Sequence, residues 1–163
     1  MSVRKKTVWI ATILVAVFVA AGFFAISQAN ISALPKPGGF ETSIATPLRN
    51  WLIRRAASGP IPPAPPATPE AISQGANMFG MACATCHGQG GRHPTAVGGG
   101  LYPRAADLAS PAVQELSDRE LFWVIKNGIR MTGMPGFGRT LTNNEIWQLV
   151  DFVRSLPNQP QVP

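Results

Sequence analysis

Five consecutive residues, Cys83-Ala84-Thr85-Cys86-His87, hold both cysteines and one of the two histidines of the chain. Two thiols separated by two residues can each add to one vinyl group of a haem, and the histidine that follows is then placed to bind the iron from one face. The pattern therefore predicts one covalently attached haem c, with Cys83 and Cys86 as the attachment points and His87 as the first axial ligand.

Other uses of a C-x-x-C pair agree less well with the rest of the chain. A structural zinc site needs four ligands, and the sequence has no second cysteine pair to supply the others. A thioredoxin-like dithiol would stand at the head of a helix within a βαβ pattern, which the sequence does not contain. A disulfide across two residues would close a very short loop and would stabilise the fold little.

The second axial ligand has several candidates. They are His93, Met78, Met81, Met131 and Met134. Met78 and Met81 immediately precede the attachment residues, so neither is expected to reach the opposite face of the macrocycle, and His93 is expected to face solvent in a loop. Met134 lies in a turn 47 residues after His87, which is far enough for the chain to pass round the haem edge and return on the far side. Met131, three residues earlier, is the alternative to Met134 as the second axial ligand.

The elements that must position these residues are predicted to be helices. Each of them opens on a residue or capping box that can accept the free backbone N–H groups of a first turn. The helices begin at the caps Thr68, Ser110, Ser117 and Thr142, and the three longer ones end at about Ala82, at Gly128 and before Pro157. No stretch alternates convincingly enough to predict a strand. The domain is therefore expected to be all-α.

With this arrangement, residues 68–157 resemble a class I c-type cytochrome, over somewhat more than half of the chain. The residues that carry the resemblance are Cys83–His87, Gly75 and Phe79 on the first helix, Leu149 and Phe152 on the last, and the Gly133-Met134-Pro135 turn. The resemblance implies a class I cytochrome c fold around one covalent haem. It also implies Met134, in preference to Met131, as the second axial ligand.

The same resemblance implies partners around the haem. A proline carbonyl commonly accepts the Nδ1–H of the proximal histidine in this family, and Pro94 and Pro103 are both available here. The segment Leu101-Tyr102-Pro103 is the more similar, although its spacing from His87 is longer than in compact members. Side chains that could contact the haem propionates are Arg104, Trp123 and Arg130.

The N-terminal residues 1–28 are expected to be a single transmembrane anchor. Val8–Ile26 is a run of 19 residues without a charge, which as a helix would be about 29 Å long and would match the hydrocarbon core of a bilayer. The basic cluster Arg4-Lys5-Lys6 before it predicts a cytoplasmic N-terminus and an extracytoplasmic, periplasmic haem domain at a bacterial inner membrane. The alternative is a signal peptide that is cleaved after Ala29.

The linker, residues 29–68, contains two features before the cytochrome domain at 69–158 and the tail at 159–163. Leu48, Trp51 and Leu52 fall on one helical face within 47–57, which predicts a short amphipathic helix on the outer leaflet, a contact for a partner subunit, or an ordered piece of linker. Residues 59–69 hold six prolines, which favour an extended polyproline spacer.

Charge does not point to a nucleic-acid partner. Residues 1–68 carry seven basic side chains and one acidic one, whereas residues 69–163 carry seven of each, so the excess positive charge lies in the leader and linker.

Three functions are compatible with the sequence. Under the first two, the protein is expected not to be an enzyme and to bind no small-molecule substrate. One is a tethered carrier that shuttles electrons between membrane redox complexes. The second is a fixed electron-entry subunit of an oxidase, a dehydrogenase or a photosynthetic reaction centre. The third is a haem enzyme or gas sensor in which Met134 dissociates from the iron.

Overall fold

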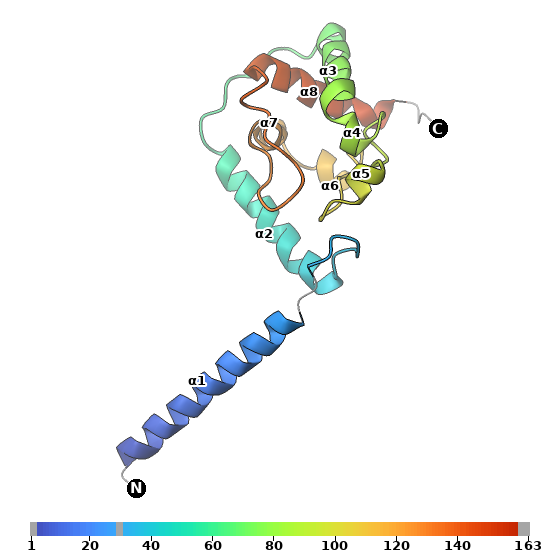
Figure 1. Ribbon diagram of the computed structural model, residues 1–163. Coiled ribbons are helices and arrows are strands. Elements are labelled where there is room, and N and C mark those ends of the chain that lie inside the picture. The colour runs from blue at the N-terminus through green and yellow to red at the C-terminus, as the bar shows by residue number, and fades with distance from the viewer. Residues whose placement is uncertain (1–2, 29–30, 160–163) are drawn as a thin grey trace. The chain divides into compact units, whose positions relative to one another are not determined.

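A computed structural model describes residues 3–28 and 31–159, and within these residues the chain is all-helical, without strands (Figure 1). The chain divides into a unit at Met1–Ser32 and a unit from Ala33 onward, and each is described by itself. The helices are α1 (Val3–Ser27), α2 (Gly39–Ala57), α3 (Pro69–Ala82), α4 (Ala84–His87), α5 (Ala96–Gly99), α6 (Pro111–Gln114), α7 (Asp118–Asn127) and α8 (Asn143–Ser155), followed by the 3-10 helix η1 (Leu156–Asn158).

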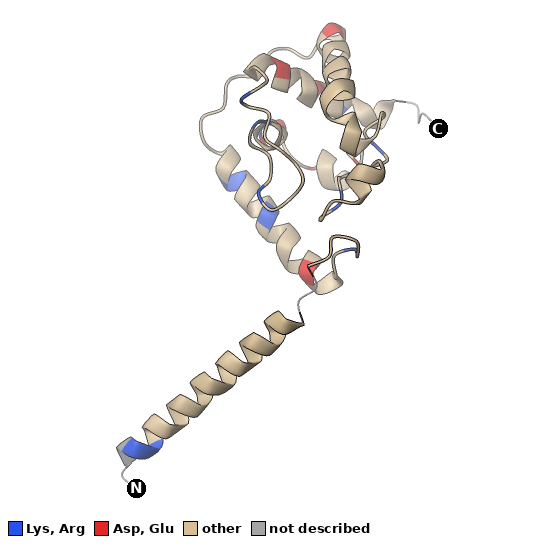
Figure 2. Cartoon of the chain, viewed as in Figure 1, with Lys and Arg blue, Asp and Glu red and all other residues tan. Residues whose placement is uncertain are grey.

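The first unit contains α1, a helix long and apolar enough to cross a membrane over Lys5–Ser27 by length and composition. Its large apolar side chains are exposed along the whole helix. Basic side chains lie at its N-terminal end, and no charged side chain follows along the helix (Figure 2). The predicted span at Val8–Ile26 thus lies within one helix, whereas the predicted cleavage site at Ala29 lies outside the described residues.

The core of the second unit is the crossing of α3 and α8 (Figure 1). At Gly75 a Cβ atom would come within 2.0 Å of the backbone oxygen of Gln148, so only glycine permits this approach. Phe79 and Phe152 pack beside the crossing with ring centroids 4.9 Å apart, and Leu149 is buried next to them. The predicted pairing of the first and last helices is confirmed.

We expect Gly75→Ala to destabilise the fold by about 1–3 kcal/mol, because the added methyl group must push two helix backbones apart. Gly80→Ala on the same helix is the matched control, since a Cβ there meets nothing within 4 Å. It should be neutral or stabilising by up to about 1 kcal/mol through helix propensity. Urea unfolding of both full-length variants in detergent measures the difference, and equal free energies of unfolding would contradict the close approach.

Helices start after Thr68, Ser110, Ser117 and Thr142 as the sequence predicts, but the Ser110 side chain caps no N–H group and donates instead to the Asp107 carbonyl. The Thr68 hydroxyl accepts a hydrogen bond from the Ala71 N–H, with Pro69 as the first helical residue of α3. Complete capping boxes open α7 at Ser117 and α8 at Thr142. These side chains satisfy N–H groups that the first turn of a helix leaves without a partner.

Helix α2 differs from the expected linker segment at 47–57 in length. It begins at Gly39 and continues through Pro47, a residue that is disfavoured inside helices and that made the sequence suggest a start there. The helix also packs on α7 of its own unit, where it buries Ile53 and Ala57. One face of this segment therefore contacts the cytochrome domain itself, a possibility outside the three that the sequence suggested.

Three polar contacts hold the end of α2 on α7. The Arg54 guanidinium lies 3.3 Å from a carboxylate oxygen of Glu120, whose side chain is only 8% exposed. Arg119 donates to the carbonyl oxygens of Ala57 at 2.9 Å and Gly59 at 2.6 Å. Since Arg119 satisfies carbonyl groups at the C-terminal end of α2, the start of the proline-rich segment is fixed to the same surface.

The opposite face of α2 carries the apolar residues that the sequence grouped together. Leu48, Trp51 and Leu52 are each about half exposed, and Ile44 extends this row by one turn. The Arg55 guanidinium lies 5.6 Å from the centre of the Trp51 ring, in the range of a cation–π contact. We call Ile44, Leu48, Trp51 and Leu52 the outer stripe of α2.

Acid is expected to weaken the contact between α2 and α7. Burial alone would raise the pKa of Glu120, but the Ser117 hydroxyl and N–H and the Arg54 charge together hold that pKa below its usual range. A lowered folded-state pKa contributes stability above the ordinary value near pH 4.3, and this stability is lost as the pH falls through the folded value. Glu120→Gln should lower the free energy of unfolding by about 1–3 kcal/mol at pH 7. It should also make that free energy less dependent on pH in the acid range.

The matched control for Glu120 is Glu145→Gln. Glu145 forms the same capping box on α8, and among the described residues it makes no ion pair with an arginine. Urea unfolding between pH 7 and pH 3, together with limited proteolysis of the α2 segment, measures both effects. If Glu120→Gln and Glu145→Gln exposed α2 to protease equally, Glu120 would not anchor α2.

Candidate functional site

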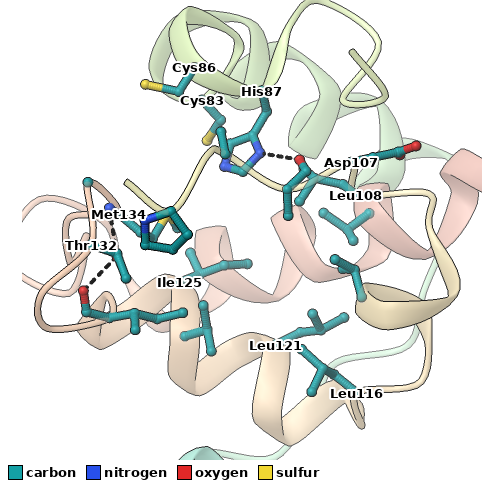
Figure 3. A pocket seen from close by; sticks show the side chains of 18 of the residues that line it. Cys83, Cys86, His87, Asp107, Leu108, Leu116, Leu121, Ile125, Thr132 and Met134 are labelled. Carbon is teal, nitrogen blue, oxygen red and sulfur yellow. Dashed lines mark hydrogen bonds between the residues drawn. The ribbon is translucent and has the colours of Figure 1, made fainter. Parts of the chain in front are cut away.

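One cavity of about 480 Å³ collects most of the residues that the sequence singled out (Figure 3). Its walls are largely apolar and come from α3, α7, α8, α2 and the connecting loops. The apolar lining includes Phe79, Leu101, Leu108, Leu116, Leu121, Val124, Ile125, Leu149 and Val153. The residues that bring chemistry to the cavity are Cys83, Cys86, His87, Pro103, Arg104 and Met134, with Arg49 and Asn50 from α2.

The attachment residues follow directly after α3: Cys83 lies between α3 and α4, and Cys86 and His87 lie on α4. Helix α3 ends at Ala82, the Cys83 N–H donates to the Phe79 carbonyl, and the His87 N–H donates to the Cys83 carbonyl. Both cysteines line the cavity, and they form no disulfide with each other. Burial, with the neighbouring Cys86 as a smaller cause, raises the pKa of Cys83 to about 11, so this thiol is protonated at neutral pH and faces apolar surroundings.

A backbone carbonyl orients the imidazole of His87. The Nδ1 atom lies 2.9 Å from the carbonyl oxygen of Ala106 (Figure 3). Because a carbonyl can only accept, Nδ1 carries the proton, and Nε2 is left with a free lone pair for a metal. The expectation that Pro103 or Pro94 would be the acceptor is wrong, since the Ala106 carbonyl takes this role three residues beyond Pro103.

A short loop is locked against the attachment turn. The Cys86 carbonyl accepts a hydrogen bond from the Thr95 N–H at 3.1 Å, and the Thr95 hydroxyl donates to the Thr85 carbonyl at 2.5 Å. At Gly98, on α5, a Cβ atom would lie 2.0 Å from the Cys86 oxygen. The chain after the motif thus packs directly on the backbone of the cysteine that precedes His87.

Met134 reaches the same cavity from the connection between α7 and α8. Its N–H donates to the Thr132 hydroxyl at 3.1 Å (Figure 3). Its carbonyl accepts a hydrogen bond from the Ile129 N–H at 3.2 Å. Gly128 ends α7 at φ 69°, and a Cβ there would lie 2.6 Å from the Met134 oxygen. These contacts hold the backbone of the turn that carries Met134.

The other candidates for the second axial ligand lie elsewhere. Met131 is 91% exposed and Met81 is 78% exposed. Met78 packs against the hydrophobic core, and His93 is exposed in its loop. Among the described residues that line the cavity, Met134 is the methionine.

The residues expected near the haem propionates differ in whether they line the cavity, and their contact with a propionate stays a prediction. Pro103 and Arg104 line it, but neither Trp123 nor Arg130 is among the described residues of its walls. On α7 the neighbours Leu121, Val124 and Ile125 face the cavity, while Phe122 packs on Trp147 of α8 with ring centroids 4.5 Å apart. Trp123 lies on a third side of α7, which is why it is not among the residues that line the cavity.

Sequence reasoning missed four residues at this site. The Ala106 carbonyl gives no side-chain signal, because any residue offers the same oxygen. Arg49, Asn50 and Ile53 line the cavity from α2, a helix that the sequence placed in the linker. The only sequence signal was the helical spacing of Thr46, Asn50, Ile53 and Ala57, which is weak because two of these residues are polar.

The residues present fit a covalently bound haem. Two thiols, an imidazole with Nδ1 already occupied, and a thioether converge on one largely apolar cavity. Within the part of the chain that the structure describes, no group of three or more His, Cys, Asp or Glu side chains is placed to hold a metal ion. The helical fold and this donor set define a class I c-type cytochrome.

The comparisons with known proteins agree with this class. The model of the family "cytochrome C oxidase, cbb3-type, subunit III" matches residues 70–153, and the chain belongs to this family of cytochrome c domains. A relative in Sinorhizobium medicae, the cbb3-type cytochrome c oxidase subunit FixP, is 32% identical over 101 residues, which cover 57% of this chain and 32% of FixP.

Two further similarities are more distant. The quinohemoprotein alcohol dehydrogenase ADH IIB of Pseudomonas putida is 28% identical over 92 residues, covering 55% of this chain and 12% of that enzyme. A chain of the reducing HAO-like protein complex of Kuenenia stuttgartiensis shares the fold, with a TM-score of 0.50 and 21% identity over 60% of this chain and 49% of that one. The chain therefore matches a third or less of each curated relative, over a cytochrome c domain whose general role is electron transfer.

Proposed function

We propose that this protein is a membrane-anchored monohaem cytochrome c that passes single electrons between redox proteins, with haem c bound through Cys83 and Cys86. The observation that carries the proposal is the convergence of these thiols, His87 and Met134 on one apolar cavity. A bound haem would supply an iron that alternates between the ferrous and ferric states. The protein's part is to hold that iron, set its reduction potential and exclude other ligands.

Each side chain has a separate task. His87 offers Nε2 from the side of the attachment turn, and the Ala106 carbonyl keeps the ring in this tautomer. Met134 offers a neutral thioether, which favours ferrous iron and raises the reduction potential. The apolar walls act in the same direction, because a low-dielectric surrounding disfavours the additional charge of the ferric state. If His87 and Met134 both bound the iron of a haem held here, the protein would supply both ligands and would leave no place on the iron for a substrate.

We infer that residues 5–27 anchor the protein in a bacterial inner membrane. The uncharged run Val8–Ile26 within this helix is long enough to cross the hydrocarbon core, and Lys5 and Lys6 precede that run, which supports a cytoplasmic N-terminus and a periplasmic haem domain. Haem c is attached outside the cytoplasm in bacteria, so this orientation agrees with the attachment motif.

The deciding experiment for the function is the mass and colour of the full-length protein. Purified in detergent, it should weigh one haem more than its amino acids and should stay red after acid-acetone extraction. Its ferric spectrum should contain the long-wavelength band of a methionine–iron bond. A colourless protein would refute the proposal, and a haem protein without that band would favour the haem enzyme or gas sensor instead.

A fixed subunit of a membrane complex is the second candidate function. The outer stripe of α2 favours it, because solvent-exposed apolar rows of this kind are commonly covered by protein partners. The relative FixP is a subunit of a cbb3-type cytochrome c oxidase, which supports the same candidate. Mild solubilisation separates the candidates: a subunit should leave the membrane in a stable larger complex, whereas a free carrier should not.

A further inference from the structure

Helix α2 lies outside the residues that the family model matches, yet it forms part of the wall of the cavity. The match covers residues 70–153, whereas α2 spans Gly39–Ala57. Arg49, Asn50 and Ile53 line the cavity from this helix. The site is therefore completed by a segment that a minimal cytochrome domain would lack.

Arg49 is held in a defined orientation on that wall. Its Nε and one terminal guanidinium nitrogen donate to the Asn50 side-chain oxygen at 3.2 and 3.0 Å, and both residues are half-buried. No ion pair of Arg49 with a carboxylate is found among the described residues. The guanidinium has five N–H groups, so most of its donors remain available.

The charges around the cavity do not balance. Arg49 and Arg104 both line it, whereas Asp107 is the one carboxylate among the described lining residues. That carboxylate accepts a hydrogen bond from the Ala109 N–H at 2.9 Å, and it forms no ion pair with either arginine. Two cations beside largely apolar walls favour an anionic group on the molecule that fills the cavity.

We propose that Arg49 binds a haem propionate, and that α2 is thereby part of the haem site. The inference rests on the proposed function, since it takes haem as the occupant. Haem carries two carboxylates on the edge of the ring opposite the vinyl groups that the cysteines bind. Cys83 lies between α3 and α4 and Cys86 lies on α4, whereas α2 is held on α7. Arg–carboxylate pairing suits the planar guanidinium of Arg49.

The expected effect is electrostatic. A positive charge beside the haem disfavours the ferric state, which carries one more positive charge than the ferrous state. Removing the charge with Arg49→Gln should shift the equilibrium about three- to tenfold towards ferric iron, a fall in reduction potential of about 30–60 mV at 59 mV per tenfold. Arg49→Lys keeps the charge and should keep most of the potential.

The matched control is Arg55→Gln. Arg55 lies on the same helix and loses the same charge, but it contacts Trp51 on the outer side and is not among the described residues that line the cavity. Arg55→Gln should change the equilibrium between ferric and ferrous iron by less than twofold. Spectroelectrochemical titration of the full-length proteins in detergent gives these values. Resonance Raman spectra add a second reading, because Arg49→Gln alone should shift the propionate bending band.

The outcomes separate the inference from the function. If haem is attached and the methionine–iron band is intact, but Arg49→Gln matches Arg55→Gln in potential and in the propionate band, then Arg49 binds no propionate and the proposed function stands. If the wild-type chain holds no haem, the proposed function itself is wrong. A lowered potential with a shifted band in Arg49→Gln only, restored by Arg49→Lys, supports the inference.

Discussion

A chain in which Cys83 and Cys86 are both replaced by alanine is expected to carry no covalent haem. The two thiols line the cavity and are the only cysteines of the chain, so no other side chain can form the thioether bonds. Intact-mass measurement should give the mass of the amino acids alone, and acid-acetone should extract all of the colour. The protein should also be less stable, since the largely apolar cavity of about 480 Å³ would lose its fixed occupant.

The single variants are the internal controls for this result. Cys83→Ala and Cys86→Ala each leave one thiol, and each should retain haem through one bond in lower yield. His93→Ala, which changes an exposed loop histidine, should leave both mass and colour unaltered. If the double variant still weighed one haem more than its amino acids, the attachment site would lie elsewhere.

Replacing Met134 by histidine should lower the reduction potential on the order of 0.1–0.3 V, within the range of about 0.8 V over which axial ligands act. An imidazole stabilises ferric iron more than a thioether does. The turn that holds position 134 is fixed by hydrogen bonds of its own backbone to Thr132 and Ile129, so the substitution should change the ligand without moving the chain. The methionine–iron band should disappear with the fall in potential.

Met131→His is the matched control for Met134→His. Met131 lies three residues away, is 91% exposed and is not among the described residues of the cavity wall. Its potential and spectrum should equal those of the wild type. If the two variants behaved alike, or if Met131→His alone lost the band, the assignment of Met134 as the ligand would have to be given up.

The parts of the fold that the sequence predicted are those set by neighbouring residues. Thr68, Ser117 and Thr142 open helices because their side chains reach N–H groups only three residues away. The attachment pattern is equally local. Gly75 required the resemblance as well, since the close contact it permits is with Gln148, on a distant helix.

The docking of α2 could not be read from the sequence in the same way. It depends on contacts between residues far apart, such as Arg54 with Glu120, and on Ile53 and Ala57, which make a short apolar face. The stronger apolar row, with Leu48 and Trp51, lies on the other side and dominated the helical pattern. The sequence therefore indicated the exposed face of the helix and missed the buried one.

The hydrogen bond between His87 and the Ala106 carbonyl has a consequence for how the site can vary. Because the acceptor belongs to the main chain, exchanging the side chain at 106 leaves it in place, and a scan of point substitutions would pass over it. Insertion or deletion between Pro103 and Ala106 would instead shift the oxygen away from the ring. The basicity of the proximal imidazole is thus protected against most single replacements and open to change through loop length.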